Sequence, residues 1–397
     1  MKWRGSLVLA AILVCSVALA SAGSQGASTI LNFGSIQTPA YLSALDASKL
    51  QIAKIYPGGG SILAVIEDKM GTLDTKRQIL DYAVDRMHVN AVMIGWRRQP
   101  VWEGSDSRDQ LEIPLNSGKL NPSYIKHLDE WVSLAKEYKV YVVFEEWFSP
   151  MRATGRGQWT GFNDSTFQDR WANFYKVLGT YFRGNTSIAG FIPGEEVLAD
   201  GDSYPYPISG SADFNELWNQ VMTKLSKALH EGDPNFNFIA IPTVDWDAGI
   251  YTLGSKAIYP NAWQPLNDTN PHVLYRVMSN PRNSIKASTL YPFDDLVWIR
   301  DHYGSSLLDG GINWHRETGL PIILECLVEW RATEAGGVWV WDTAGLQWLR
   351  DFLAAMKNEG IGLNMGEYWN ESEPYGTHDS LGNERTWVQV YSEAAYS

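Results

Sequence analysis

The stretch IAGFIPGEEVLAD, residues Ile188 to Asp200, joins a short apolar run to a pair of glutamates. Short apolar runs of this kind are typical of the buried strands of a parallel sheet. Because a carboxylate is costly to bury, Glu195 and Glu196 need a partner or a chemical task where such a strand ends. The stretch therefore predicts a strand that delivers charged groups to one edge of a sheet.

The same arrangement occurs three more times in the chain. It is found in residues 140–147 (VYVVFEEW), 321–330 (PIILECLVEW) and 361–369 (IGLNMGEYW). In each case an apolar run leads to glutamate and then to tryptophan. We therefore expect four strands to bring carboxylates and indole rings to one rim of the fold.

Strand patterns alternate with helix patterns along most of the 397 residues. The predicted strands are residues 62–66, 89–96, 140–147, 188–196, 236–242, 284–291, 320–329 and 360–369. Helices are predicted at residues 73–87, 122–138, 165–182, 213–230, within 296–318, and at 346–358 and 385–394, whereas residues 251–283 are interpreted as a loop-rich insertion. Alternation of this kind implies a parallel sheet, and eight repeats without a composition break favour a closed (β/α)8 TIM barrel.

The N-terminus has the pattern of a secretory signal peptide. Lys2 and Arg4 precede an apolar run at residues 7–19, and small-residue cleavage sites follow at 18–20 and 20–22. We therefore expect residues 1–22 to be removed and residues 23–397 to form a single domain that is secreted. No second apolar stretch approaches the length of a membrane span, so no membrane contact is expected after cleavage.

Composition narrows the classes of partner. The formal net charge of −13 argues against nucleic-acid binding and is compatible with a neutral polysaccharide or oligosaccharide. Removal of the signal also removes Cys15 and leaves Cys326 alone, so no internal disulfide is expected. The 18 Trp and 19 Tyr residues serve core packing in part, and their rings also stack on sugar faces.

Other chemistries find little support in the sequence. The seven His residues show no metal-ligand spacing, and there is no G-x-S-x-G elbow or dinucleotide-binding G-x-G-x-x-G pattern. We therefore expect neither a metal nor an organic cofactor. A carboxylate cluster that holds Ca²⁺ or Mg²⁺ stays as a minor alternative.

The strand ends resemble those of clan A (β/α)8 glycoside hydrolases, especially the family 5 cellulases and mannanases. The end of the predicted fourth strand is similar to their G-Y-E-L-x-N-E pattern, and LPIILECLVEW is similar to their L-P-V-x-x-x-E strand. By this resemblance Glu196 is the acid/base and Glu325 the nucleophile. Glu329 has the same strand parity as Glu325 and is the second candidate for the nucleophile.

The resemblance also implies a substrate-binding set. Arg97 would support the nucleophile, Tyr291 would match the tyrosine of a sixth-strand H-x-Y-x-P pattern, and Trp369 would form the sugar platform. The remaining members of the set are Glu146, Trp147, Glu195 and, if it is not the nucleophile, Glu329.

The chain departs from the family pattern at several positions. Glu195 replaces the asparagine before the acid/base, Glu145-Glu146-Trp147 replaces a histidine on the third strand, and Thr289 replaces the sixth-strand histidine. Each site residue could also serve the scaffold alone, without contact with a substrate. One of Glu195 and Glu196 can cap a helix, and Glu145 can pair with Arg97 or Arg98.

Two hypotheses of different class follow. The first is a secreted retaining glycoside hydrolase that cleaves β-linked polysaccharide, β-glucan or mannan, internally by a two-glutamate double displacement. The second is a barrel that binds carbohydrate without hydrolysing it. An exo-acting β-glycosidase is a third interpretation, which the shape of the cleft would decide.

Overall fold

The computed structural model describes the central strands and most of the helices around them. The described residues are 30–31, 45–46, 50–55, 72–97, 118–147, 165–193, 212–240, 266–278, 315, 319–325, 333–335, 338–367, 376–379 and 381–394. The predicted signal peptide lies outside these ranges. Within the described part of the chain, no helix combines the length and the apolar character needed to cross a membrane.

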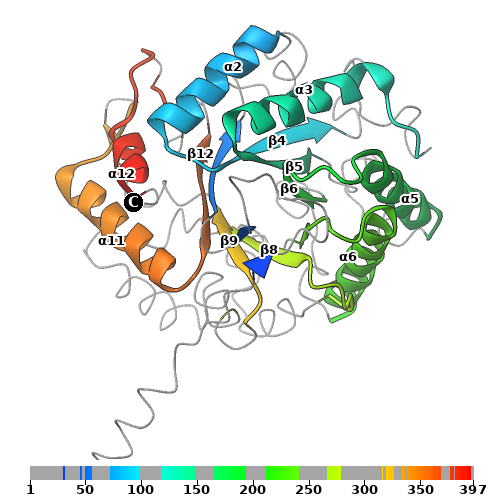
Figure 1. Cartoon of the computed structure of the whole chain (residues 1–397). Helices are drawn as coiled ribbons and strands as arrows, with labels where there is room; N and C mark the ends of the chain where they lie inside the picture. Colours follow the sequence, from blue (N-terminus) through cyan, green and yellow to red (C-terminus); the bar gives the residue numbers. More distant parts are fainter. Residues whose placement is uncertain are drawn as a thin grey trace, which may run out of the picture.

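A parallel sheet occupies the centre of the molecule (Figure 1). Its strands are β3 (Gln51–Ile55), β4 (Ala91–Arg97), β5 (Tyr141–Trp147), β6 (Ile188–Ile192), β7 (Phe238–Ala240), β8 (Val273–Met278), β9 (Ile322–Glu325) and β12 (Gly362–Glu367). Each strand pairs with the next in this order, and β12 pairs with both β9 and β3. The described strands therefore close into a barrel.

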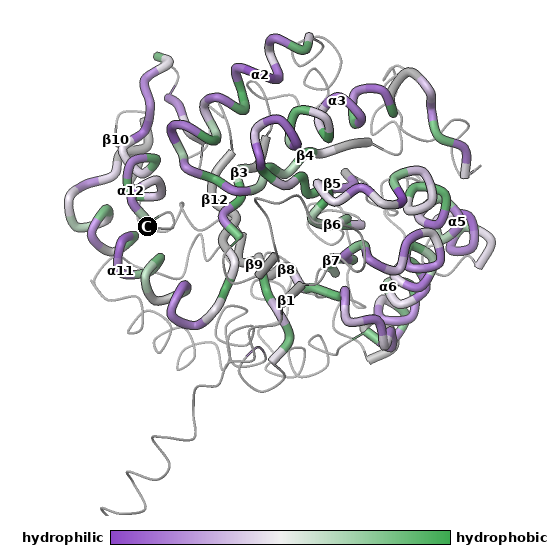
Figure 2. The backbone as a smooth tube through the Cα atoms, in the orientation of Figure 1, coloured by the Kyte–Doolittle hydropathy of each residue, from purple (hydrophilic) through white to green (hydrophobic). Residues whose placement is uncertain are grey.

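Helices surround the sheet and follow the strands in sequence (Figure 1). They are α2 (Leu73–Asp81), the π-helix η3 (Tyr82–Arg86), α3 (Pro122–Tyr138), α5 (Ser165–Tyr181), α6 (Ala212–Gly232), α11 (Thr343–Asn358) and α12 (Thr386–Ala394). Hydrophilic and hydrophobic residues alternate along α2, α5 and α6 (Figure 2), as expected of helices with one face on the sheet and the other in solvent. Two short antiparallel pairs, β1 (Ile30–Leu31) with β2 (Leu45–Asp46) and β10 (Thr333–Ala335) with β11 (Val338–Val340), complete the described elements.

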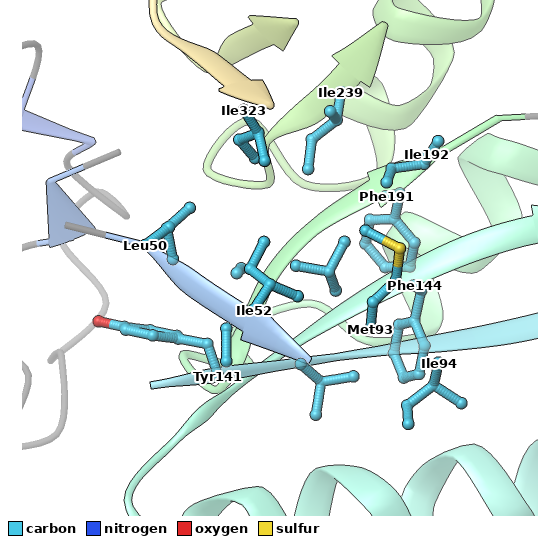
Figure 3. Packing of buried hydrophobic residues seen from close by; sticks show 14 of the residues in the cluster. Leu50, Ile52, Met93, Ile94, Tyr141, Phe144, Phe191, Ile192, Ile239 and Ile323 are labelled. Atoms are coloured by element: carbon cyan, nitrogen blue, oxygen red, sulfur yellow. The ribbon is translucent and has the colours of Figure 1, made fainter. Parts of the chain in front are cut away.

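Side-chain contacts with the helices show which face of β3 and of β7 points outward. The Gln51 amide of β3 donates to the Tyr391 carbonyl of α12 at 3.0 Å. The Phe238 ring of β7 packs edge-on against Tyr175 of α5. Because alternate strand residues point to opposite faces, Ile52 belongs to the interior. Figure 3 shows Ile52 and other buried aliphatic side chains from several strands gathered there.

Helices α5 and α6 approach each other closely. A Cβ added to Gly232 at the end of α6 would lie 2.6 Å from the Lys176 carbonyl oxygen and 2.8 Å from the Thr180 nitrogen. These are backbone atoms of α5, which cannot move aside as a flexible side chain could. Glycine at this position therefore permits the contact between the two helices.

A polar cluster ties together the segments that enter β7 and β8. The buried Asp268 carboxylate accepts hydrogen bonds from the Ser226 hydroxyl at 2.6 Å, the Asn270 backbone N–H at 3.0 Å and His230 Nδ1 at 2.9 Å. Burial by itself would raise the pKa of Asp268, but these three donors outweigh it and hold the pKa below its ordinary value. The cluster joins α6 to the start of β8, at the end of the barrel opposite to the carboxyl ends of the strands.

Most of the predicted order of elements is confirmed. The predicted helix at 122–138 has the observed bounds of α3, and the predicted second, third, fourth, fifth, seventh and eighth strands contain or overlap the observed ones. The prediction of the first barrel strand at 62–66 was wrong, because β3 occupies that place in the sheet. Two apolar runs, residues 52–56 and 62–66, flank a Pro-Gly turn signal at 57–60, and the barrel uses the first of them.

The predicted sixth strand was also wrong. The place between β7 and β9 is taken by β8, which lies within the stretch interpreted as a loop-rich insertion. Its sequence VLYRVM follows a run of Asn, Asp and Pro that predicted a loop, and Arg276 interrupts its apolar pattern. Residues 284–291 lie outside the described residues.

Candidate active site at the carboxyl ends of the strands

The carboxyl ends of the barrel strands bring several charged positions to one rim. Arg97 ends β4, Glu325 ends β9 and Glu367 ends β12. Because all strands of the barrel are parallel, these residues lie at the same end of the barrel. In barrels of this kind, the end formed by the carboxyl ends of the strands carries the active site.

The two glutamates of β5 face in opposite directions. Both are fully buried. The Glu146 carboxylate accepts hydrogen bonds from Trp171 Nε1 at 3.0 Å and from the Tyr175 hydroxyl at 2.7 Å, through the same oxygen, Oε2. Both donors belong to α5, so Glu146 lies between the sheet and this helix. We therefore reassign Glu146 from the predicted substrate-binding set to the packing of α5 on the barrel.

Glu145 has the opposite parity and belongs to the interior face of β5. It lies in register with Gly95 of β4 and with Ile192 of β6. Phe144, its neighbour on the outer face, packs against Phe182 beyond the end of α5, which fixes the same parity independently. The strand-three carboxylate of the barrel interior is thus Glu145.

Glu325 is the last residue of β9. Its backbone lies in register with Met278 of β8 and Asn364 of β12. The residue predicted to be the nucleophile is therefore found at the carboxyl end of a barrel strand.

Arg97 and Trp147 form the last register pair between β4 and β5. Their backbones therefore lie side by side at the carboxyl ends of these strands. Their place in the substrate-binding set stays a prediction.

Five predicted site residues lie outside the described residues: Glu195, Glu196, Tyr291, Glu329 and Trp369. The first two follow β6, which ends at Ile192. The assignment of Tyr291 to the sixth barrel strand is wrong, because β8 is that strand and ends at Met278.

Two charged residues within barrel strands were missed by the sequence analysis. Lys54 of β3 lies in register with Met93 and Glu367, and Arg276 of β8 lies in register with Ile323. The available signal was a single cation inside an otherwise apolar run, in QIAKI and in VLYRVM.

Metal-ligating residues do not gather within the described ranges. No group of three or more His, Cys, Asp or Glu side chains there has a geometry that could hold a metal ion.

No protein-family model and no curated protein sequence matches the chain. Solved structures do. One is the endoglucanase Cel5A of Pseudomonas stutzeri, which is 13% identical with a TM-score of 0.56, covering 88% of this chain and 94% of that one. The chain shares its fold with family 5 glycoside hydrolases.

Two more of these structures were solved with sugars bound. A GH5 xyloglucan-specific endo-β-1,4-glucanase from a metagenomic library, in complex with cellotriose, is 12% identical with a TM-score of 0.58 and covers 89% of this chain and 97% of that one. A GH5_18 protein of Streptomyces cattleya, in complex with Manβ1-4GlcNAc, is 13% identical with a TM-score of 0.59 and covers 87% and 80%. At these identities the likeness is one of fold.

Proposed function

We propose that the chain is a glycoside hydrolase built on a complete (β/α)8 barrel. The observation that carries this proposal is the place of Glu325 as the last residue of β9, in a barrel whose fold is shared with family 5 glycoside hydrolases. A glutamate at the end of this strand suits attack on an anomeric carbon, because an ionised carboxylate is the usual nucleophile of retaining glycosidases.

The second carboxyl group of the proposed mechanism is Glu196. It is chosen over Glu195 because the resemblance of this strand end to the G-Y-E-L-x-N-E pattern places the acid/base at Glu196.

The proposed reaction proceeds in two steps. In the first, Glu196 gives its proton to the glycosidic oxygen while a Glu325 oxygen bonds to the anomeric carbon, and the leaving sugar departs as an alcohol. In the second, Glu196 takes a proton from water, the water oxygen bonds to the anomeric carbon, and the bond to Glu325 breaks. Two inversions retain the configuration of the sugar.

We further propose that the substrate is a β-linked glucan or mannan that is cleaved internally, outside the cell. The carboxylates and indoles at the strand ends support a sugar-binding rim, and the pattern of residues 1–22 supports export. Arg97, Trp147, Glu195 and Trp369 would contact or orient the sugar. An exo-acting β-glycosidase stays as the alternative mode of cleavage.

A hydrolysis screen of the mature chain tests the proposal. The substrates are soluble β-1,4-glucan, β-1,3-glucan, mannan and xylan, and the variants are Glu196→Gln, Glu325→Gln and Glu329→Gln. We expect turnover by the wild type and by Glu329→Gln, and its loss in the other two variants. Loss in Glu329→Gln with turnover retained in Glu325→Gln would move the nucleophile to Glu329.

The nucleophile is tested more directly by chemical rescue. With an activated glycoside, azide should enter the space left by Glu325→Ala and form a glycosyl azide of inverted configuration. No such product should form with wild type, whose own carboxylate occupies that space. A wild type that binds these polysaccharides but hydrolyses none of them would favour the non-catalytic carbohydrate-binding barrel.

A further inference from the structure

We propose that Asn267 is the acceptor of an N-linked glycan, transferred during export from an oligosaccharide that is carried on a polyprenyl diphosphate. The proposal rests on the proposed function in one respect, the export of the chain. It does not depend on the chemistry assigned to the barrel.

The sequence contains four Asn-x-Ser/Thr sequons, the motif that is recognised for N-glycosylation in secreted proteins. They begin at Asn163, Asn185, Asn267 and Asn370. The first and the last lie outside the described residues. Because a sequon is a short motif, the structure has to decide which of the other two stays accessible once the chain has folded.

The sequon at Asn267 lies on a segment whose successive side chains alternate between inside and outside. Leu266 is buried and the Asp268 side chain is only 7% exposed, whereas Asn267 and Thr269 are exposed. The carboxamide to be modified and the hydroxyl that the transferase recognises are therefore both open to solvent. Among the described residues, the Asn267 carboxamide has no hydrogen-bond partner, so modification of its nitrogen breaks no contact there.

The backbone of this segment is held by other elements. The Leu266 N–H donates to the Tyr275 hydroxyl of β8 at 2.8 Å, and the Asn267 N–H donates to Thr223 Oγ1 of α6 at 3.2 Å. The Asp268 carboxylate joins the segment to α6 through the polar cluster described above. These bonds use backbone N–H groups and an inward-facing side chain, and they keep the outward side chains exposed.

The sequon at Asn185 is closed by folding. Its Oδ1 accepts a hydrogen bond from the Ser187 backbone N–H at 3.1 Å, and Thr186 and Ser187 are both buried. Ser187, which carries the hydroxyl of this sequon, has an exposed fraction of 0%. Since a transferase must reach both the carboxamide and the hydroxyl, access is lost as the turn between α5 and β6 forms. Asn267 therefore begins the described sequon that folding leaves available.

The transfer needs no group from the barrel. The carboxamide nitrogen of Asn267 bonds to the anomeric carbon of the first sugar, and the bond from that carbon to the diphosphate oxygen breaks. The amide proton passes to a base of the transferase, and the polyprenyl diphosphate leaves. Because Asn267 precedes β8, which begins at Val273, the glycan would extend from the amino end of the barrel. It would not cover the carboxyl ends of the strands.

Secretion of the full chain from a eukaryotic host tests the acceptor. Peptide N-glycosidase converts a glycosylated asparagine to aspartate, and peptide mass spectrometry then locates the change. We expect conversion at Asn267 in most secreted molecules. Asn267→Gln and Thr269→Ala should abolish it, whereas the matched control Thr269→Ser keeps the hydroxyl and should retain it. Since both side chains are exposed, all three variants should unfold, once deglycosylated, at the wild-type temperature.

A second preparation, with a host leader in place of residues 1–22, separates the acceptor from the export. An unmodified Asn267 under both leaders would overturn the proposal, and so would conversion at Asn185 alone. Conversion at Asn267 only with the host leader would support the acceptor and count against export by the chain's own leader. Conversion at Asn267 in a chain that hydrolyses none of the polysaccharides would support the acceptor and count against the hydrolase.

Discussion

Replacing Glu146 by methionine tests the assignment of this residue to the packing of α5. Methionine has a similar volume and no acceptor oxygen. The change removes the acceptor of the Trp171 N–H and of the Tyr175 hydroxyl, which approach Oε2 at 3.0 Å and 2.7 Å. Because Glu146, Trp171 and Tyr175 are all fully buried, water cannot replace the carboxylate freely.

The expected cost follows from the two hydrogen bonds. A hydrogen bond to a charged group contributes about 1.5–3 kcal/mol, so the loss of both predicts that Glu146→Met lowers the free energy of unfolding by about 3–6 kcal/mol. Glu146→Gln retains one acceptor oxygen of the same reach. It should cost about 1–2 kcal/mol, because the remaining bonds lose the assistance of the charge.

Urea or guanidinium denaturation, followed by the fluorescence of the tryptophans, measures both variants against wild type. Turnover is then compared in the absence of denaturant, at a temperature at which all three proteins are folded. We expect the two losses of stability in the stated order and an unchanged turnover per folded molecule. A Glu146→Met protein that unfolds with the wild-type midpoint would refute the reasoning, and so would one that keeps its stability and loses turnover.

Two further predictions concern the scaffold. Asp268→Asn should destabilise the chain by about 1–3 kcal/mol near pH 7, because a neutral amide is a weaker acceptor for the Ser226, Asn270 and His230 donors and offers one oxygen instead of two. The pKa of Asp268 is lower in the folded state than in the unfolded state, so the ionised carboxylate stabilises the fold above the unfolded pKa and loses this effect as pH falls through the folded pKa. The difference in thermal stability between Asp268→Asn and wild type should therefore disappear below about pH 4 and persist at pH 6. Gly232→Ala should lower the free energy of unfolding by about 1–3 kcal/mol, because the added Cβ meets the backbone of α5. The control Glu231→Ala, at the exposed neighbouring position, should change it by less than about 0.5 kcal/mol. Equal denaturation midpoints for the two variants would contradict the close approach of the helices.

The sequence determined the order and type of most elements. The helix at 122–138 begins with proline, which suits a first turn, and repeats its buried residues at helical spacing, so local patterns sufficed. The runs that became β5, β6 and β9 are short, apolar and bounded by polar residues. These features depend on near neighbours in the chain, and so they can be recognised without knowledge of the fold.

Other features depended on partners far away in the sequence. Gln51 is polar yet buried, because it bonds to α12, some 340 residues later. The choice between the runs at 52–56 and 62–66 for the first strand depended on such distant contacts. Strand β8 was concealed by a preceding run of turn-forming residues and by Arg276. A pattern of hydrophobicity cannot distinguish a polar residue that faces solvent from one that meets a distant partner.

The faces of β5 could be decided only by the tertiary structure. In a parallel barrel one face of each strand packs on the interior and the other on helices, so both faces are buried and hydrophobicity does not distinguish them. Hydrophobicity therefore could not show that Glu146, which was predicted to bind substrate, faces the helices. The contacts of Glu146 with Trp171 and Tyr175 of α5 decided this and left Glu145 to the barrel interior.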